Sequence, residues 1–118
     1  MAAIRVLEYL ERSGRSPWRR WFNDLDAVAA AKVGTALYRL GQGNFSTVEG
    51  VGSGVFEVRI NFGPGYRIYF GKDGETVVIL LGGSTKKRQS AAIGAAHKAW
   101  EDYKQRRKKG AAWERAWH

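Results

Sequence analysis

The stretch GVFEVRINFGPGYRIYF, residues 54–70, decides the fold that the sequence predicts. β-Branched and aromatic residues alternate with polar ones on both sides of a glycine-proline-glycine turn, which indicates two antiparallel strands. Pairing Ile60 with Ile68 puts the large apolar side chains on one face, and a one-residue slip destroys that arrangement. The other pairs predicted by this register are Phe62 with Tyr66, Val58 with Phe70, Asn61 with Arg67, and Arg59 with Tyr69.

The same register gathers polar side chains on the opposite face of the hairpin. Arg59, Arg67 and Tyr69 converge there with Glu57, and we expect this face to be exposed. The bland interpretation is that the two arginines are solvated cross-strand residues, with Glu57 as an ion-pair partner. The functional interpretation is that they form a site for an anion.

Composition indicates one globular domain with a strong positive charge. The 118 residues include 20 Lys and Arg against 11 Asp and Glu, a formal net charge of +9. This balance favours contact with a polyanion such as nucleic acid, an anionic membrane or an acidic protein, the alternative being a basic protein with no such partner. The absence of cysteine excludes disulfides, thiolate metal sites and cysteine nucleophiles.

Metal-binding, secreted and membrane-spanning proteins are also disfavoured. Two histidines are too few for a multi-histidine metal site, and no metal or cofactor is predicted. No signal peptide pattern and no apolar run of about 20 residues is present, so we expect a cytoplasmic protein with no membrane association.

A strand and two helices are predicted before the hairpin. Residues 4–10 form the strand, and Ser16 followed by Pro17 is a good helix start because the hydroxyl can accept from a free backbone N–H. Trp, Phe and Leu residues then follow at helical spacing, which indicates a packing face. A second helix is predicted over residues 26–40, and the glycine-rich segment 41–53 reads as an irregular connection.

A strand and a long helix are predicted after the hairpin. Residues 76–81 are apolar without alternation, which is typical of a central strand buried on both faces, with Gly82 and Gly83 ending it. A helix follows over about residues 86–107. The predicted fold is α+β with the order β-α-α-β-β-β-α, a small, mainly antiparallel sheet packed with helices and the N-terminal strand at one edge. The predicted domain spans residues 1–109, and residues 110–118 form a tail that no pattern places.

Cations that follow the central strand extend the polar hairpin face. Lys86, Lys87 and Arg88 lie where that strand passes into the last helix, so a phosphodiester held there meets several positive charges. This suits RNA cleavage by the RNA's own 2′-hydroxyl, which needs in-line orientation, charge neutralisation and two proton transfers.

Arg67 is the first choice for stabilising the transition-state charge, because a guanidinium forks onto two phosphate oxygens and stays protonated. Tyr69, or a lysine with a lowered pKa, is the predicted proton carrier. His97 lies between Ile93 and Trp100 at helical spacing, so it is expected at the boundary of a packing face and not in the site.

Four segments carry a family resemblance: SGRSP at 13–17, RLGQGNF at 39–45, GVFEVRINFGPGYRIYF at 54–70 and LLGGSTKKRQ at 80–89. The chain resembles the RelE/HigB-like toxins of type II toxin–antitoxin modules, in the branch of phage-derived HigB-like addiction-module killer proteins of the RelE/ParE superfamily. The segments span most of the chain in the family's order.

The resemblance implies a RelE/ParE-like toxin fold and a metal-independent mRNA interferase that cleaves translated mRNA on the ribosome. It also implies a cognate helix-turn-helix antitoxin as partner, with operator DNA contacted only through that antitoxin. The implied catalytic residues are Arg67, Tyr69, Lys87 and Arg59, and the implied RNA- and phosphate-binding residues are Lys86, Arg88, Arg59 and Asn61.

Two departures and two alternatives accompany the resemblance. Many relatives carry an acidic residue where Ser90-Ala91-Ala92 stand here, and the tail beyond Arg107 extends past the matching part.

Two alternative functions remain open. The first is a ParE-like inhibitor of DNA gyrase without nuclease activity, and the second is a non-catalytic basic RNA-binding module. A gyrase binder has no need of Arg67 and Tyr69 beside a lysine pair, whereas a nuclease does.

Overall fold

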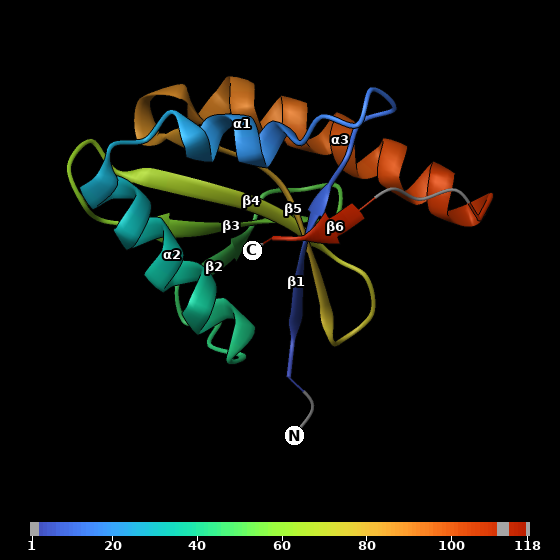
Figure 1. The fold of residues 1–118 in the computed structure, drawn as a ribbon, viewed down its shortest axis with the longest axis horizontal. Coiled ribbons are helices and arrows are strands. Elements are labelled where there is room, and N and C mark those ends of the chain that lie inside the picture. Colours follow the sequence, from blue (N-terminus) through green and yellow to red (C-terminus); the bar gives the residue numbers. More distant parts are fainter. Residues whose placement is uncertain (1–2, 111–113, 118) are drawn as a thin grey trace.

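The computed structural model describes residues 3–110 and 114–117 as one sheet packed between helices (Figure 1). The elements in chain order are β1 (Arg5–Tyr9), α1 (Pro17–Asn23), α2 (Ala27–Gly41), β2 (Val48–Gly50), β3 (Val55–Ile60), β4 (Tyr66–Lys72), β5 (Val77–Thr85), the 3-10 turn η1 (Lys86–Arg88), α3 (Gln89–Lys108) and β6 (Glu114–Ala116). The predicted α+β class is confirmed. Two short strands, β2 and β6, are additional to the predicted order.

The six strands lie in the order β2-β3-β4-β5-β1-β6. β1 pairs with β5 in parallel and every other neighbouring pair is antiparallel. The N-terminal strand was predicted at an edge of the sheet. That prediction is wrong, because β6 pairs with the outer side of β1. Trp117 donates its backbone N–H to Val6 and packs against Trp18, which holds the chain end on the sheet. Trp113, the other tryptophan of the tail, lies outside the described residues.

Local signals explain the first two helices. The Ser16 hydroxyl accepts from the N–H of Arg19 at 2.9 Å and Pro17 is the first helical residue, as predicted for α1. Asp26 caps α2 in the same way by accepting from Ala29. α1 and α2 pack on one face of the sheet around Trp18, Leu37, Ile68, Phe70 and Leu80.

The predicted hairpin faces are confirmed, but the register is wrong by two residues. Ile60 pairs with Tyr66 and Val58 with Ile68, so the connecting loop covers residues 61–65. The loop is longer because Gly63 and Gly65 adopt positive φ and the Gly65 N–H bonds back to the Phe62 carbonyl. A two-residue shift preserves the faces, since side chains alternate with a period of two. The remaining predicted pairs are replaced by Phe56 with Phe70, Glu57 with Tyr69 and Arg59 with Arg67.

The polar face of the hairpin is covered, contrary to the predicted exposure. α3, the long orange helix across the top of Figure 1, packs on it through Ala96, Trp100 and Tyr103. The ring of Trp100 lies where a side chain on Gly71 would stand, with 2.5 Å to a built Cβ. Alternation of polar and apolar residues distinguishes the two faces of a strand, but it does not tell a solvated polar face from one that a helix covers.

β5 is the central strand, as predicted, and extends four residues beyond the predicted end. Val78–Leu81 are buried on both faces, and pairing continues through Gly82 and Gly83 to Thr85. A Cβ built on Gly83 would lie 2.2 Å from the ring of Trp21. Gly83 is therefore a place where an indole packs directly on the strand backbone, and the two glycines do not end the strand.

Candidate functional site

The candidate site lies at the end of the sheet where the β3–β4 loop meets η1. The N–H of Lys86 donates to the carbonyl of Gly65 at 2.9 Å, which ties the start of η1 to the loop. A Cβ built on Gly65 would lie 3.3 Å from the Cβ of Lys86 and 3.9 Å from Nη1 of Arg67. Gly65, with φ of +78°, therefore marks the point where the side chains of Arg67 and Lys86 approach each other.

Arg67 is a buried cation with little internal compensation. Its side chain makes one hydrogen bond, from Nη1 to the carbonyl of the neighbouring Tyr66 at 3.2 Å, and its buried Nε has no partner. Within the described residues, no carboxylate oxygen lies within 4 Å of its guanidinium. With 6% of its surface exposed, Arg67 carries a charge that a bound anion would stabilise.

Tyr69 is enclosed beside Arg67 and is fully buried. Its hydroxyl is 3.0 Å from Oγ of Ser84, and the Ser84 hydroxyl lies 2.9 Å from the carbonyl of Thr85, to which it donates. Burial raises the pKa of the Tyr69 phenol and the carboxylate of Glu57 raises it further, against opposing effects of Ser84 and Arg67. The phenol is thus held protonated and away from solvent.

Arg59 differs from Arg67 because two carboxylates neutralise it. Its Nε lies 3.3 Å from Oε2 of Glu57, and its Nη2 pairs with Glu49. Glu57 is buried and also accepts from the side-chain amide of Gln89 at 3.2 Å. The ion pair considered for Glu57 therefore forms with Arg59 and leaves Arg67 without one.

The structure brings some predicted site residues together and leaves others apart. Arg67 and Lys86 meet at Gly65, and Tyr69 lies two residues along β4 from Arg67, whereas Lys87 and Arg88 lie farther along η1 and Asn61 lies at the start of the loop. The side chains of Lys86, Lys87, Arg88 and Asn61 are all exposed. Among the described residues, no hydrogen bond or ion pair joins the side chain of Lys87, Arg88 or Asn61 to Arg67.

Ser84 and Gln89 were not among the predicted site residues. Their signal was available in the segment GGSTKKRQ, since pairing of β5 with β4 places Ser84 opposite Arg67. His97 lies at the edge of the packed region with Nε2 3.0 Å from the carbonyl of Val51, as predicted for a boundary residue.

Residues 3–110 and 114–117 contain no group of three or more His, Cys, Asp or Glu side chains placed to hold a metal ion. None of the helices in these ranges combines the length and apolar character needed to cross a membrane.

Fold and site together define a small, basic α+β protein with a buried arginine that has no carboxylate partner among the described residues at one end of its sheet. Residues 20–106 match the family described as phage derived protein Gp49-like (DUF891), and the chain belongs to that family. It is a family of toxin–antitoxin toxins of the HigB/RelE kind, which implies an antitoxin partner. An uncharacterized protein of Haemophilus influenzae is 39% identical over 74 residues, which cover 62% of this chain and 75% of that protein.

Proposed function

We propose that this toxin is a ribosome-dependent mRNA interferase that cleaves mRNA by attack of the 2′-hydroxyl on the adjacent phosphate. The observation that carries the proposal is Arg67, a buried guanidinium without a carboxylate partner at the accessible end of the sheet. A protein that needed Arg67 only for folding would be expected to pair it, because an uncompensated buried charge is costly.

The chemistry assigned to the site requires no group beyond the chain and the RNA. The 2′-oxygen attacks phosphorus, the bond to the 5′-oxygen of the next nucleotide breaks, and a 2′,3′-cyclic phosphate and a 5′-hydroxyl are formed. One proton leaves the 2′-hydroxyl and one is delivered to the leaving oxygen. Arg67 and Lys86 stabilise the extra negative charge on the phosphate oxygens in the transition state.

Proton transfer is assigned to the lysines and not to Tyr69. A catalytic acid or base must reach the reacting oxygen, whereas the Tyr69 hydroxyl is buried and occupied by Ser84. We propose that Tyr69 positions Ser84 and the neighbouring Arg67, while Lys86 or Lys87 exchanges protons with the RNA. Arg59, Arg88 and Asn61 contact flanking phosphates in this proposal.

The partners follow from the same proposal. A cognate antitoxin with a helix-turn-helix domain neutralises the toxin, and operator DNA is contacted through that antitoxin. The toxin's own targets are the ribosome and its mRNA, toward which the net charge of +9 steers it in the cytoplasm.

Induction of the chain without its partner tests the proposal. We expect growth arrest with new 5′ ends inside translated messages, detected by primer extension, and no such ends on induction of Arg67→Ala. Intact mRNA with double-strand DNA breaks would replace the nuclease proposal by gyrase inhibition. RNA binding without growth arrest would favour the non-catalytic module.

A further inference from the structure

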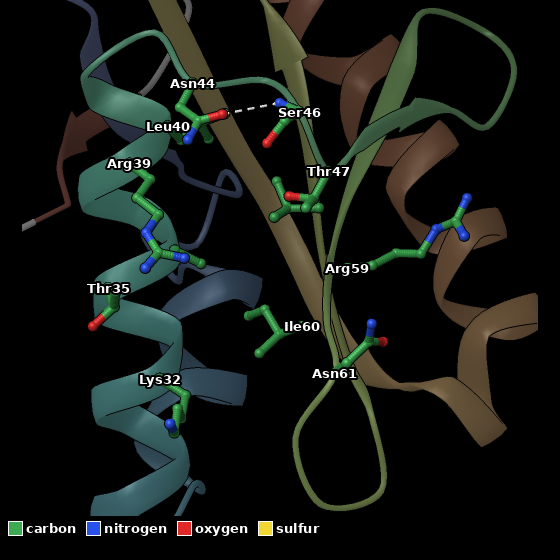
Figure 2. Close-up of a pocket in the computed structure, with 12 residues that line it drawn as sticks. Lys32, Thr35, Arg39, Leu40, Asn44, Ser46, Thr47, Arg59, Ile60 and Asn61 are labelled. Carbon is green, nitrogen blue, oxygen red and sulfur yellow. Dashed lines mark hydrogen bonds between the residues drawn. The ribbon is translucent and has the colours of Figure 1, made fainter.

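A second cationic feature lies across the hairpin from Arg67, in a groove between α2 and the outer edge of β3 (Figure 2). The groove has a volume of about 330 Å³. The ladder between β2 and β3 ends at Val58 and the Arg59 N–H still donates to the Thr47 carbonyl at 3.3 Å, so only Ile60, the last residue of β3, lies beyond this pairing. Two cations from α2, Lys32 and Arg39, line the groove together with Arg59 near the end of β3 and Asn61 just beyond it.

The groove is positively charged on the α2 side. Lys32 and Arg39 lie seven residues apart on the helix, a rise of about 10 Å, and both are exposed. No ion pair within the described part of the chain involves either residue, and no carboxylate lines the groove between α2 and β3. The Nζ of Lys32 lies 5.2 Å from the ring centre of Phe62, above the loop that leads to Arg67.

The rest of the lining suits a sugar–phosphate chain. Its walls carry short hydroxyl and amide side chains from Thr35, Asn44 and Thr47, and its floor is apolar at Leu40 and Ile60. Single-stranded nucleic acid is held by cations along its backbone combined with apolar surface beneath its sugars and bases. This combination distinguishes the groove from a surface shaped for a protein helix, which needs a larger apolar area.

The groove also joins the candidate site. Arg59 and Asn61 border its β3 side, but the Arg59 side chain points away from α2 (Figure 2), on the face where Arg59 lies opposite Arg67 of β4. Since Glu49 and Glu57 neutralise Arg59, the net charge of the groove comes from Lys32 and Arg39. An RNA strand bound at Arg67 would reach this groove by crossing the edge of β3.

We propose that this groove binds the backbone of single-stranded RNA next to the cleaved phosphate, with Lys32 and Arg39 each contacting a phosphate. The inference rests on the proposed nuclease function, to which it adds a substrate path remote from the reacting atoms. The two cations determine affinity for RNA, while Arg67 determines the cleavage step.

The test compares the full-length protein with a Lys32→Gln/Arg39→Gln double variant. The probe is a short fluorescein-labelled single-stranded RNA of mixed sequence, and fluorescence anisotropy is measured over a range of salt concentrations. Each phosphate contact on a single strand contributes about 0.7 to the slope of log affinity against log salt, so we expect the slope to fall by about 1.4. Affinity at about 0.1 M salt should fall on the order of tenfold.

A matched control removes the same charge elsewhere. Lys98 and Lys108 are exposed on α3 and line no part of the groove, so Lys98→Gln/Lys108→Gln should keep nearly the wild-type slope. Equal slopes for the two double variants would overturn the inference. Unchanged RNA binding with loss of antitoxin co-purification in the groove variant would also overturn it, by assigning the surface to a protein partner.

The outcomes separate the groove from the nuclease. If the groove variant binds RNA more weakly but the wild type leaves mRNA intact on induction, the groove proposal is supported and the nuclease proposal is refuted. Cleavage by the wild type, together with an unaltered slope of log affinity against log salt in the groove variant, would refute the groove proposal and leave the nuclease proposal standing.

Discussion

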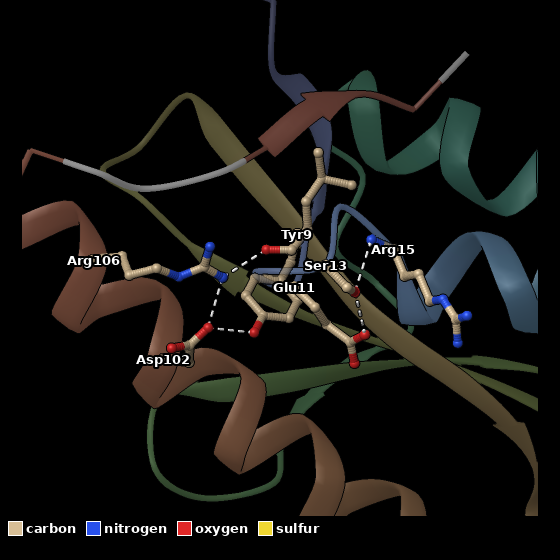
Figure 3. A network of polar contacts seen from close by, with 7 residues as sticks. Tyr9, Glu11, Ser13, Arg15, Asp102 and Arg106 are labelled. Atoms are coloured by element: carbon tan, nitrogen blue, oxygen red, sulfur yellow. Dashed lines mark hydrogen bonds and ion pairs between the residues drawn. The ribbon is translucent and has the colours of Figure 1, made fainter.

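Two buried arginines, one paired with a carboxylate and one without such a partner among the described residues, differ in how the fold compensates their charge. Arg106, on α3, has 3% of its surface exposed and Arg67, on β4, has 6%. Arg106 donates to the carboxylate of Asp102 and to the carbonyl of Leu10, both at 2.6 Å (Figure 3). Arg67 has only the carbonyl of Tyr66, at 3.2 Å.

The surroundings of the two guanidinium groups extend the contrast. Arg106 lies over the ring of Tyr9, whose hydroxyl donates to the same Asp102 carboxylate at 2.5 Å. This network joins α3 to β1 through a neutralised ion pair. On the hairpin face that carries Arg67, the carboxylate of Glu57 is engaged by Arg59 and Gln89. Burial therefore holds Arg67 in place without the carboxylate partner that Arg106 has.

The largest expected effect is on activity, at Arg67. Arg67→Met should lower the rate of mRNA cleavage by about 10²–10³-fold, because one charge stabiliser of the transition state is lost. The free energy of unfolding should change by less than about 1 kcal/mol, since no internal carboxylate loses its partner. Primer extension and urea unfolding measure the two quantities. A loss of several kcal/mol with unchanged cleavage by the folded fraction would make Arg67 a structural residue.

The opposite result, a loss of stability with little change in activity, is expected at Arg106. Arg106→Met should lower the free energy of unfolding by about 2–4 kcal/mol, because the Leu10 carbonyl loses the Arg106 donor and Asp102 keeps only the Tyr9 hydroxyl and loses its cation. Cleavage per folded molecule should stay within about twofold of wild type, since Arg106 is remote from the candidate site. Urea unfolding and cleavage normalised to folded protein check this. A stable but inactive variant would contradict the assignment.

The Tyr9 network predicts a loss of stability at alkaline pH. Burial and the hydrogen bond to Asp102 raise the pKa of Tyr9 to about 12, above its ordinary value of 10.0. A raised folded-state pKa gives stability that is complete below pH 10 and is lost as the pH rises toward 12, with a slope of up to about 1.4 kcal/mol per pH unit. Tyr9→Phe should make the stability of the protein less dependent on pH in this range, as urea unfolding at several pH values measures.

A matched control for that slope is Tyr38→Phe, because the side chain of Tyr38 is 69% exposed on α2. It should retain the wild-type pH dependence. If Tyr9→Phe and Tyr38→Phe behave alike, the Asp102 network does not carry the alkaline effect.

The smallest expected effect is at Tyr69. Tyr69→Phe should lower cleavage by less than about threefold and leave the pH–rate profile unchanged, because the phenol is buried and bonded to Ser84. Stability should fall by about 1 kcal/mol through loss of that hydrogen bond. Single-turnover cleavage across pH measures the effect. A loss of a hundredfold with a shifted profile would return Tyr69 to the catalytic role that its position in the sequence suggested.

Local chemistry in the sequence accounts for much of the fold. Ser16 and Asp26 cap the first turns of α1 and α2, and the apolar run before Gly82 indicates the central strand. The alternation in residues 54–70 assigns each hairpin side chain to its correct face, even though the pairing is displaced by two residues. These features depend on neighbours in the chain, so they can be read without the rest of the molecule.

Long-range packing accounts for what the sequence did not reveal. Strand β6 forms because Trp117 docks beside Trp18 and Arg19 donates to the Trp117 carbonyl, contacts between opposite ends of the chain. Coverage of the polar hairpin face by α3 follows from the fit of Trp100 over Gly71, which no periodicity encodes.

The sequence by itself determined the α+β class, the two hairpin faces and the positive charge, because these follow from residue type and local spacing. Only the tertiary structure decided which polar residues of the hairpin remain available to a ligand. Arg59 and Arg67 are equivalent in the strand pattern, yet Arg59 lies beside Glu49 and Glu57 while Arg67 has no carboxylate partner within the described residues. Such compensation depends on distances of a few ångströms between separate elements, and those distances exist only once the sheet and α3 have packed together.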